Sequence, residues 1–258
     1  MSENRFTENS SALSGMQGKV ALVTGGSRGM GAAIATRLAL AGADVAFTYS
    51  SAMDKGRATL AKIEQAGRRG LAIPADNTKP ADVQAAVEQT VSMLGGLDIL
   101  VNNAGIFVAK PIADLTLEEF DETIAINLRA AFIASQAAAA HMGENGRIIS
   151  IGSNLAERVP QPGLSLYSLS KSALVGLTKG LARDLGPKGI TVNIIHPGST
   201  NTDMNPADGE HADAQRSAMA IPRYGEPDDI AGLVTWLASS EGRFVTGAAF
   251  TIDGGTNA

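Results

Sequence analysis

The sequence of 258 residues contains no cysteine. Disulfides, thiolate nucleophiles and cysteine-based zinc sites are therefore excluded, and a reducing compartment is favoured. Aromatic residues make up only 4% of the chain against 29 glycines, a mixture that suits close backbone packing better than a β-sandwich. The three histidines, His141, His196 and His211, lie too far apart in the sequence to indicate a shared metal site, so we expect no metal.

Positive charge and long apolar runs are also scarce. Lys and Arg total 21 against 26 Asp and Glu, giving a net charge of −5, and this balance argues against nucleic acid as a partner. No apolar run approaches the ~20 residues of a membrane-spanning helix. Residues 1–15 are polar, lack the apolar stretch of a signal peptide and are interpreted as a flexible tail. We therefore expect a cytoplasmic protein that binds no membrane.

Short valine- and isoleucine-rich runs alternate with helical patterns over residues 16–258. The strands are expected at 19–24, 44–48, 71–73, 97–102, 147–151, 190–195 and 249–252, and the helices at 30–41, 54–65, 80–93, 118–140, 167–185 and 227–238. This alternation predicts an α/β fold: one domain with a doubly wound (Rossmann) parallel sheet of seven strands and helices on both faces. Residues 198–218 form the one long irregular stretch, which we interpret as a substrate loop.

A glycine-rich turn follows the first expected strand and opens the first helix. Its backbone can approach a pyrophosphate closely, and the helix N-terminus favours an anion. The residues expected to contact a dinucleotide here are Gly25, Ser27, Arg28, Gly29, Met30 and Gly31. The same stretch also matches the G-x-S-x-G pattern of a hydrolase, with Ser27 as nucleophile, but no upstream strand exists to supply an oxyanion donor.

The end of the second expected strand indicates which dinucleotide binds. NAD sites usually carry an acid about 20 residues after the turn, whereas this chain has Tyr49, Ser50 and Ser51 there. Hydroxyl groups accept a 2′-phosphate that an acid would repel, and Arg28 adds a cation. The sequence therefore favours NADP(H).

Tyr167 and Lys171 are four residues apart in an expected helix, so their side chains share one face. A nearby cation favours the phenolate, and we expect Lys171 to lower the pKa of Tyr167 from its usual value of about 10. Such a tyrosine can exchange a proton with a carbonyl or alcohol oxygen.

Several further motifs occur in a fixed order along the chain: the Asn-Asn-Ala-Gly run at 102–105, Asn127, Ser153, the Pro-Gly pair at 197–198 and the ending at 251–255. Together with the glycine turn and Tyr167, they make residues 16–258 resemble the short-chain dehydrogenase/reductase family. The resemblance is closest to its ketoacyl-carrier-protein-reductase-like members.

This resemblance implies roles for individual residues. Tyr167 would be the general acid/base, Lys171 would tune it and hold the nicotinamide ribose, Ser153 would bind the substrate oxygen, and Asn127 would hold a water of a proton relay. The other implied cofactor contacts are Asp76 and Asn77 near the adenine, Asn103, Ala104 and Gly105 beneath the cofactor, and Pro197, Gly198, Thr200 and Thr202 near the nicotinamide.

The spacing between the serine and the tyrosine departs from the family pattern. It is fourteen residues here and usually thirteen, so that counting back thirteen from Tyr167 reaches Asn154. We select Ser153 because it directly follows the expected strand 147–151, and Asn154 remains the alternative. The longer spacing resembles the naphthol-reductase branch of the family and hints at a cyclic or aromatic ketone.

The sequence thus predicts an oxidoreductase that uses NADPH to reduce a ketone or aldehyde, in the manner of carbonyl and 3-oxoacyl reductases. A small-molecule carbonyl compound or alcohol is the expected partner, and the resemblance implies a homotetramer or a dimer. The alternative from a different class is a non-catalytic nucleotide-binding sensor on the same fold.

Overall fold

The computed structural model describes residues 15–51 and 53–258, and the expected tail at 1–15 lies outside them apart from Gly15. A parallel sheet of seven strands runs through the molecule in the order β3-β2-β1-β4-β5-β6-β7. The strands are β1 (Val20–Val23), β2 (Asp44–Tyr49), β3 (Gly70–Pro74), β4 (Ile99–Asn102), β5 (Arg147–Ile151), β6 (Thr191–Pro197) and β7 (Ala249–Ile252). The predicted doubly wound sheet is confirmed.

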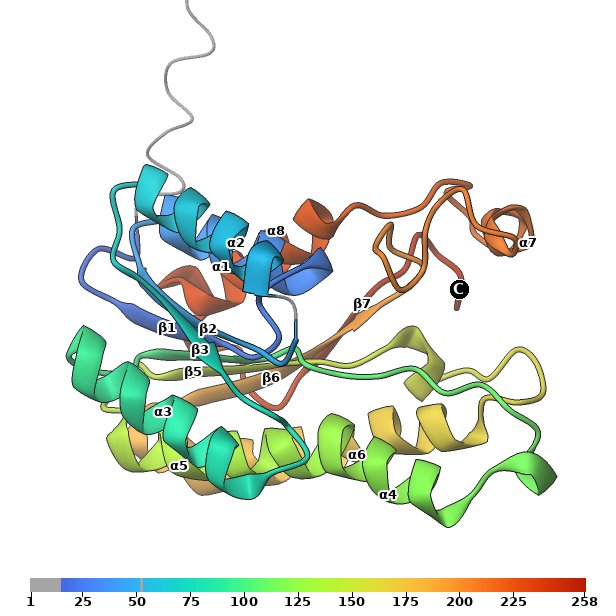
Figure 1. Cartoon of the computed structure of the whole chain (residues 1–258), viewed down its shortest axis with the longest axis horizontal. Helices are drawn as coiled ribbons and strands as arrows, with labels where there is room; N and C mark the ends of the chain where they lie inside the picture. The colour runs from blue at the N-terminus through green and yellow to red at the C-terminus, as the bar shows by residue number, and fades with distance from the viewer. Residues whose placement is uncertain (1–14, 52) are drawn as a thin grey trace, which may run out of the picture.

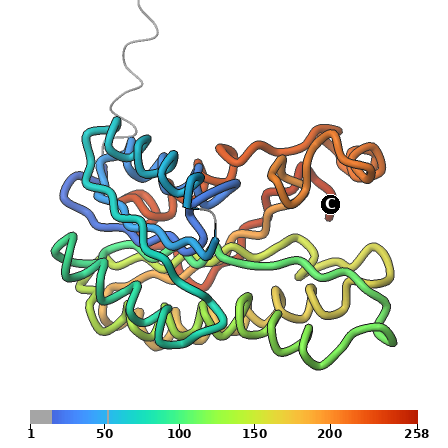
Figure 2. Tube along the Cα trace, in the orientation of Figure 1, coloured from blue at the N-terminus to red at the C-terminus, as the bar shows by residue number. Residues whose placement is uncertain are grey.

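Helices cover both faces of this sheet (Figure 1). One layer consists of α1 (Gly29–Leu40), α2 (Met53–Gln65) and α8 (Pro227–Ala238). The opposite layer consists of α3 (Pro80–Leu94), α4 (Leu117–Ile124), α5 (Ala130–His141) and α6 (Ser165–Leu185). The tube in Figure 2 shows both layers around one central sheet. Within the described residues, no helix is long and apolar enough to cross a membrane.

Side chains of β1 show why these short runs become interior strands. Ala21 and Val23 pack into the cluster beneath α1 and α8, whereas Val20 and Leu22 pack into the cluster on the other face of the sheet. All four are buried. A strand that buries both of its faces needs apolar residues at every position, which is the pattern that the sequence carries.

The strand order indicates at which edge of the sheet a ligand would bind. β1 pairs with β2 on one side and with β4 on the other, so the chain reverses its direction of winding between these neighbours. In open α/β sheets, ligands bind outside the carboxyl ends of the strands at such a reversal. The segments that follow β1, β2, β3 and β4 therefore meet at one place.

The expected helix at 118–140 is continuous but not uniform. It contains α4, a π-helical turn at Ala125–Arg129 and α5, and the N–H of Ala130 donates to the carbonyl of Ala125 across that wider turn. The N-terminus of α4 is fixed by Thr116, whose hydroxyl accepts from the N–H of Glu119 at 3.2 Å. A single π turn within an α-helix is often found at a functional site.

The stretch at 198–218 was expected to be irregular, and this expectation is wrong for its last part. Residues Ala212–Ser217 form a short helix, α7. Ala212, Met219 and Tyr224 form a small apolar cluster, and the hydroxyl of Tyr224 donates to Oε1 of Gln215 at 2.9 Å. These contacts join residues far enough apart that the local sequence pattern gave no signal for them.

Candidate active site

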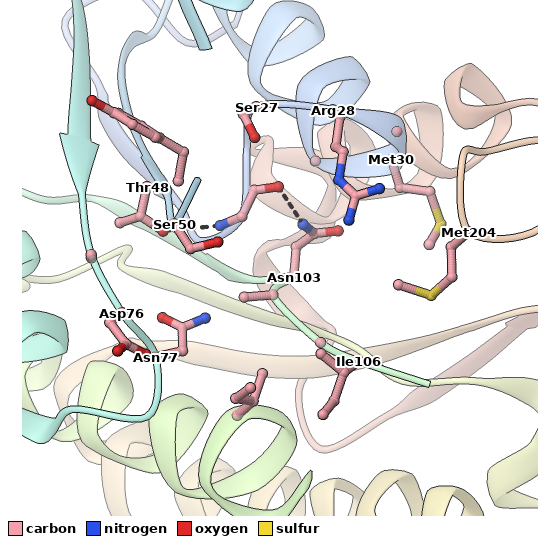
Figure 3. A pocket seen from close by; sticks show the side chains of 18 of the residues that line it. Ser27, Arg28, Met30, Thr48, Ser50, Asp76, Asn77, Asn103, Ile106 and Met204 are labelled. Atoms are coloured by element: carbon pink, nitrogen blue, oxygen red, sulfur yellow. Dashed lines mark hydrogen bonds between the residues drawn. The ribbon is translucent and has the colours of Figure 1, made fainter. Parts of the chain in front are cut away.

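A cavity of about 580 Å³ lies at the carboxyl edge of the sheet (Figure 3). Its walls come from the segments after β1, β2, β3, β4 and β6, together with the π turn and the end of α4. Its lining is glycine-rich beside α1 and polar beside β2 and β3. The cavity occupies the place where the strand order reverses, as expected for a nucleotide site.

The glycine turn forms one wall of this cavity, and its surroundings leave little room for side chains on the turn. Gly25 and Gly29 have φ values of +66° and +52°, which favour glycine. A Cβ added to Gly26 would lie 2.5 Å from Cβ of Phe47, and one added to Gly31 would lie 2.5 Å from Nδ2 of Asn103. The chain can therefore pass close to a ligand here only with glycine.

Arg28 precedes the first residue of α1, and its side chain does not cap the N-terminal N–H groups of that helix. These N–H groups and the positive end of the helix dipole favour an anion. The Arg28 side chain also lines the cavity (Figure 3). The tight glycine turn, the uncapped helix and a cation together fit the phosphates of a dinucleotide.

Asn103 holds the glycine turn in place. Its Nδ2 donates to the carbonyls of Thr24 at 2.9 Å and Gly25 at 3.1 Å. The hydroxyl of Thr24 in turn accepts from the N–H groups of Asn103 at 3.0 Å and Ala104 at 3.1 Å. The Asn-Asn-Ala-Gly run thus joins the end of β4 to the turn after β1, and the amide of Asn103 is engaged within the protein.

Most residues expected to bind the cofactor meet at this cavity. The expected residues that line it are Gly25, Ser27, Arg28, Gly29, Met30, Gly31, Tyr49, Ser50, Asp76, Asn77, Asn103, Ala104, Gly105 and Thr202. Those that do not line it are Ser51, Tyr167, Lys171, Pro197, Gly198 and Thr200. Ser51 is exposed beyond β2, whereas Pro197 and Thr200 are buried around the end of β6.

Several lining residues were not expected from the sequence as cofactor contacts: Thr48, Ala75, Thr78, Ile106, Glu122, Ile126, Asp203 and Met204. Thr48, Ala75 and Ile106 adjoin expected residues, so adjacency to a motif was the available signal. Glu122 and Ile126 come from the helix after β4, and no motif marks them. Only the packing of that helix against the sheet brings them to the cavity.

Two of the four expected catalytic residues, Asn127 and Lys171, reach the edge of this cavity at Gly105. A Cβ on Gly105, which lines the cavity, would lie 3.3 Å from both Oδ1 of Asn127 and Nζ of Lys171. Lys171 Nζ lies 5.8 Å from the ring centroid of Tyr167 and donates to the carbonyl of Ile151 at 3.0 Å. Helix α6 thus places Tyr167 and Lys171 on one face, as the spacing predicts.

Asn127 lies in the π turn and is 2% exposed. Its Oδ1 accepts from the N–H of Ile106 at 2.8 Å, and its Nδ2 donates to the carbonyl of Ile106 and to Oγ of Ser170, both at 3.0 Å. Ser170 belongs to α6, close to Tyr167, whose carbonyl accepts from its hydroxyl at 2.7 Å. Asn127 therefore links the loop after β4 to the helix that carries Tyr167 and Lys171.

Ser153 and Asn154 have different partners. The Ser153 hydroxyl accepts from the N–H of Leu155 at 3.2 Å, and its interaction with the phenol lowers the pKa of Tyr167. The amide of Asn154 donates instead to Asp253 at 3.5 Å, and the carbonyl of Asn154 accepts from Nδ2 of Asn257 at 2.8 Å. Asn154 therefore interacts with the C-terminal segment, and this arrangement favours Ser153 as the residue that faces the reacting oxygen.

The side chain of His196 binds the backbone of Ser153. It is fully buried in β6, and its Nδ1 accepts from the N–H of Ser153 at 3.2 Å. Burial lowers the pKa of His196, so the imidazole is neutral at pH 7. The buried histidine at a strand end thus has a structural contact with the candidate site, and it belongs to no metal cluster within residues 15–51 and 53–258.

The ionisation of Tyr167 differs from the expectation. Burial raises the pKa of its phenol, and the interaction with Ser153 lowers it only in part. The expected lowering by Lys171 is wrong for this arrangement, because burial dominates and Nζ lies over the ring, 5.8 Å from its centroid. Burial also lowers the pKa of Lys171 from 10.5 to about 8, so the ammonium remains mostly protonated at pH 7 but titrates close to neutral pH.

Sequence and structure comparisons agree with this geometry. The family model described as enoyl-(acyl carrier protein) reductase matches residues 25–257. A short chain dehydrogenase from Burkholderia cenocepacia J2315, solved in complex with NADP, is 62% identical, with 94% of this chain and 99% of that chain covered and a TM-score of 0.93. A dehydrogenase/reductase from Sinorhizobium meliloti 1021 is also 62% identical, with 96% and 99% covered and a TM-score of 0.94.

A third relative is named for binding a nucleotide and not as a dehydrogenase or reductase. The cyclic-di-GMP-binding biofilm dispersal mediator protein of Escherichia coli K12 is 45% identical over 237 residues, which cover 92% of this chain and 96% of that protein. The family model spans nearly the whole chain. The chain therefore belongs to the short-chain dehydrogenase/reductase family.

Proposed function

We propose that the protein is a carbonyl reductase that uses NADP(H) and has Tyr167 as its general acid/base. The observation that carries this proposal is the meeting of Ser153, Tyr167, Lys171 and Asn127 beside the dinucleotide-sized cavity, with Gly105 against two of them. The Burkholderia relative in complex with NADP supports the choice of cofactor.

The chain offers a place for each part of that cofactor. The glycine turn at 25–31 and the N-terminus of α1 would hold the pyrophosphate. Asp76 and Asn77 would contact the adenine end, where the hydroxyl and N–H of Thr78 hold the pKa of Asp76 below its usual value. Arg28 and Ser50 would take the 2′-phosphate, and Lys171 the nicotinamide ribose. When bound, NADPH supplies the hydride for the reduction.

Residues of this chain would handle the proton. Tyr167 remains a phenol at neutral pH because burial raises its pKa, so it can donate a proton to the substrate oxygen. Ser153 would donate a hydrogen bond to that oxygen as negative charge develops. Lys171, with a pKa of about 8, can pass on a proton near neutral pH. Oδ1 of Asn127 accepts from the N–H of Ile106, and its second lone pair would accept a hydrogen bond from the water of a relay.

The surroundings of Tyr167 favour an apolar substrate. The ring of Phe107 packs edge-on against the Tyr167 ring, with centroids 4.8 Å apart, and remains 46% exposed. An exposed aromatic ring beside the proton donor can contact an apolar or aromatic substituent of the substrate. We propose that ketones with such a substituent are preferred and that the loop at 198–218 forms part of the substrate site.

The test is NADPH oxidation across a panel of β-ketoesters, diketones, aryl ketones and quinones, with Tyr167→Phe as the variant. We expect turnover with part of this panel, a loss of at least ~100-fold in Tyr167→Phe, and unchanged NADPH binding in that variant. NADH serves as the parallel cofactor. If Tyr167→Phe keeps full turnover, another group is the proton donor and the proposed mechanism is refuted.

The second candidate is a nucleotide-binding sensor without turnover, which the name of the Escherichia coli relative supports. Both candidates predict NADPH binding, so binding alone does not separate them. Calorimetric binding of cyclic di-GMP, together with tight NADPH binding and no turnover across the panel, would favour the sensor. The retained Ser153, Tyr167 and Lys171 favour the enzyme, because a sensor has no use for a proton donor.

We also propose that the protein is a cytoplasmic homotetramer, or a dimer, as in the family it belongs to. Light scattering on the purified protein determines the number of subunits, and cell fractionation determines the compartment.

A further inference from the structure

Two cations from separate elements converge on one oxygen atom beside the cavity. Oδ2 of Asp203, in the loop after β6, forms an ion pair with Nζ of Lys55 in α2 and lies 3.7 Å from Nη1 of Arg28. All three side chains are about half exposed, at 50% to 56%. Arg28 and Asp203 both line the cavity, whereas no motif in the sequence marks Lys55.

The segment that carries Asp203 lies directly on the glycine turn. A Cβ on Gly29 would be 3.4 Å from Cγ2 of Thr202. Thr202 and Asn205 exchange backbone hydrogen bonds at 3.3 Å and 3.1 Å, which closes a tight turn with Asp203 and Met204 at its tip. Met204 lines the cavity on the same flank as Arg28 (Figure 3). The carboxylate of Asp203 is thus held at the edge of the candidate nucleotide site.

We propose that Lys55 is a further determinant of NADP(H) over NAD(H), that Lys55 and Arg28 together bind the 2′-phosphate, and that Asp203 is an internal anion that this phosphate displaces. The inference rests on the proposed use of NADP(H). It adds one binding residue, Lys55, and one competitor, Asp203, to the contacts that the motifs indicated.

The charges explain why a phosphate replaces the carboxylate. A phosphate monoester carries nearly two negative charges at pH 7 and three acceptor oxygens, so it can serve both cations at once. Asp203 offers one charge, and its Oδ2 is shared between Lys55 and Arg28. Half-exposed ion pairs contribute little to stability, so their opening costs little. NAD(H) has a hydroxyl in place of the 2′-phosphate and forms no ion pair with either cation at that position.

The two cations also keep Asp203 ionised. A hydrogen bond from Lys55 and the charges of Lys55 and Arg28 hold the pKa of the Asp203 carboxyl below its usual value. Removing this charge by Asp203→Asn would leave Lys55 and Arg28 without their internal anion, and the site would accept a phosphate more readily. Removing Lys55 would have the opposite effect on a phosphate and no effect on a hydroxyl.

Calorimetric titration of the full chain with two fragments isolates the 2′-phosphate. 2′,5′-ADP and 5′-AMP differ only in that group. We expect Lys55→Met to weaken 2′,5′-ADP about tenfold, the effect of losing one charge-assisted hydrogen bond, and to leave 5′-AMP unchanged. Asp203→Asn should strengthen 2′,5′-ADP several-fold and again leave 5′-AMP unchanged. Lys62→Met removes an equal charge from the exposed side of the same helix and is the matched control.

The outcomes separate this inference from the proposed function. If Lys55→Met and Lys62→Met have equal effects on 2′,5′-ADP, or if Asp203→Asn weakens 2′,5′-ADP, the inference is overturned while NADPH binding by the unmodified protein stands. If the unmodified protein binds neither NADPH nor 2′,5′-ADP, the proposed use of NADP(H) fails, and the assignment of Lys55 fails with it.

Discussion

Replacing Lys171 by methionine is expected to stabilise the protein while it removes activity. Lys171 is 4% exposed, and burial lowers its pKa from 10.5 to about 8. At about 1.4 kcal/mol per pH unit, this difference means that holding the charged form in the folded state costs about 3 kcal/mol below pH 8. Methionine has a similar shape and no charge to desolvate.

The substitution also removes a contact. Nζ of Lys171 donates to the carbonyl of Ile151 at 3.0 Å, and losing such a hydrogen bond costs about 1 to 2 kcal/mol. The net expectation is a gain of about 1 to 2 kcal/mol at pH 7. For a chain of this size, that gain raises Tm by roughly 2 to 8 °C.

The dependence on pH gives an independent check. The folded-state pKa of about 8 lies below the unfolded value of 10.5, so the unfolded chain binds more protons between these values. The penalty is therefore complete below about pH 8 and disappears as pH rises toward 10.5. The difference in Tm between Lys171→Met and the unmodified protein, measured by calorimetry without nucleotide, should shrink over this range. A lower Tm for the variant at pH 7, with a difference that does not change with pH, would refute the reasoning.

Three further substitutions test contacts along β2 and the turn after β1. Asp44→Asn should cost about 2 kcal/mol in urea unfolding at pH 7, because hydrogen bonds from Arg69 and Arg68 outweigh the burial of Asp44 and lower its pKa. That cost should disappear as pH falls through the folded-state pKa, below the ordinary value of 3.8, and a cost that persists in acid would contradict it. Gly26→Ala should destabilise by about 1 to 3 kcal/mol, since its Cβ would lie 2.5 Å from Cβ of the buried Phe47. Gly56→Ala is the matched control, because a Cβ on Gly56 would lie 3.6 Å from Cε2 of Phe47, an ordinary contact. Within α2 this alanine should raise the free energy of unfolding by about 0.5 to 1 kcal/mol. Equal effects of the two alanines in urea unfolding would rule out the steric argument.

The sequence by itself determined the elements and their order. Interior strands such as β1 need apolar residues at every position, and the glycine turn needs φ values that only glycine readily adopts, so both leave local signals. The i, i+4 spacing of Tyr167 and Lys171 likewise fixes their common helix face without reference to the rest of the fold. These features depend on neighbours in the chain, and the structure confirms them.

Only the tertiary structure decided the features that depend on distant contacts. The π turn around Asn127 accompanies hydrogen bonds from that residue to Ile106, 21 positions away. The pKa of Tyr167 rises because burial, which no local spacing reveals, outweighs the lowering by Ser153. Lys55 and Asp203 are 148 positions apart and meet only because β2 and β6 end at the same edge of the sheet. A local pattern records which backbone conformation is possible, whereas the charges and burial of a site are set by the segments that the fold brings together.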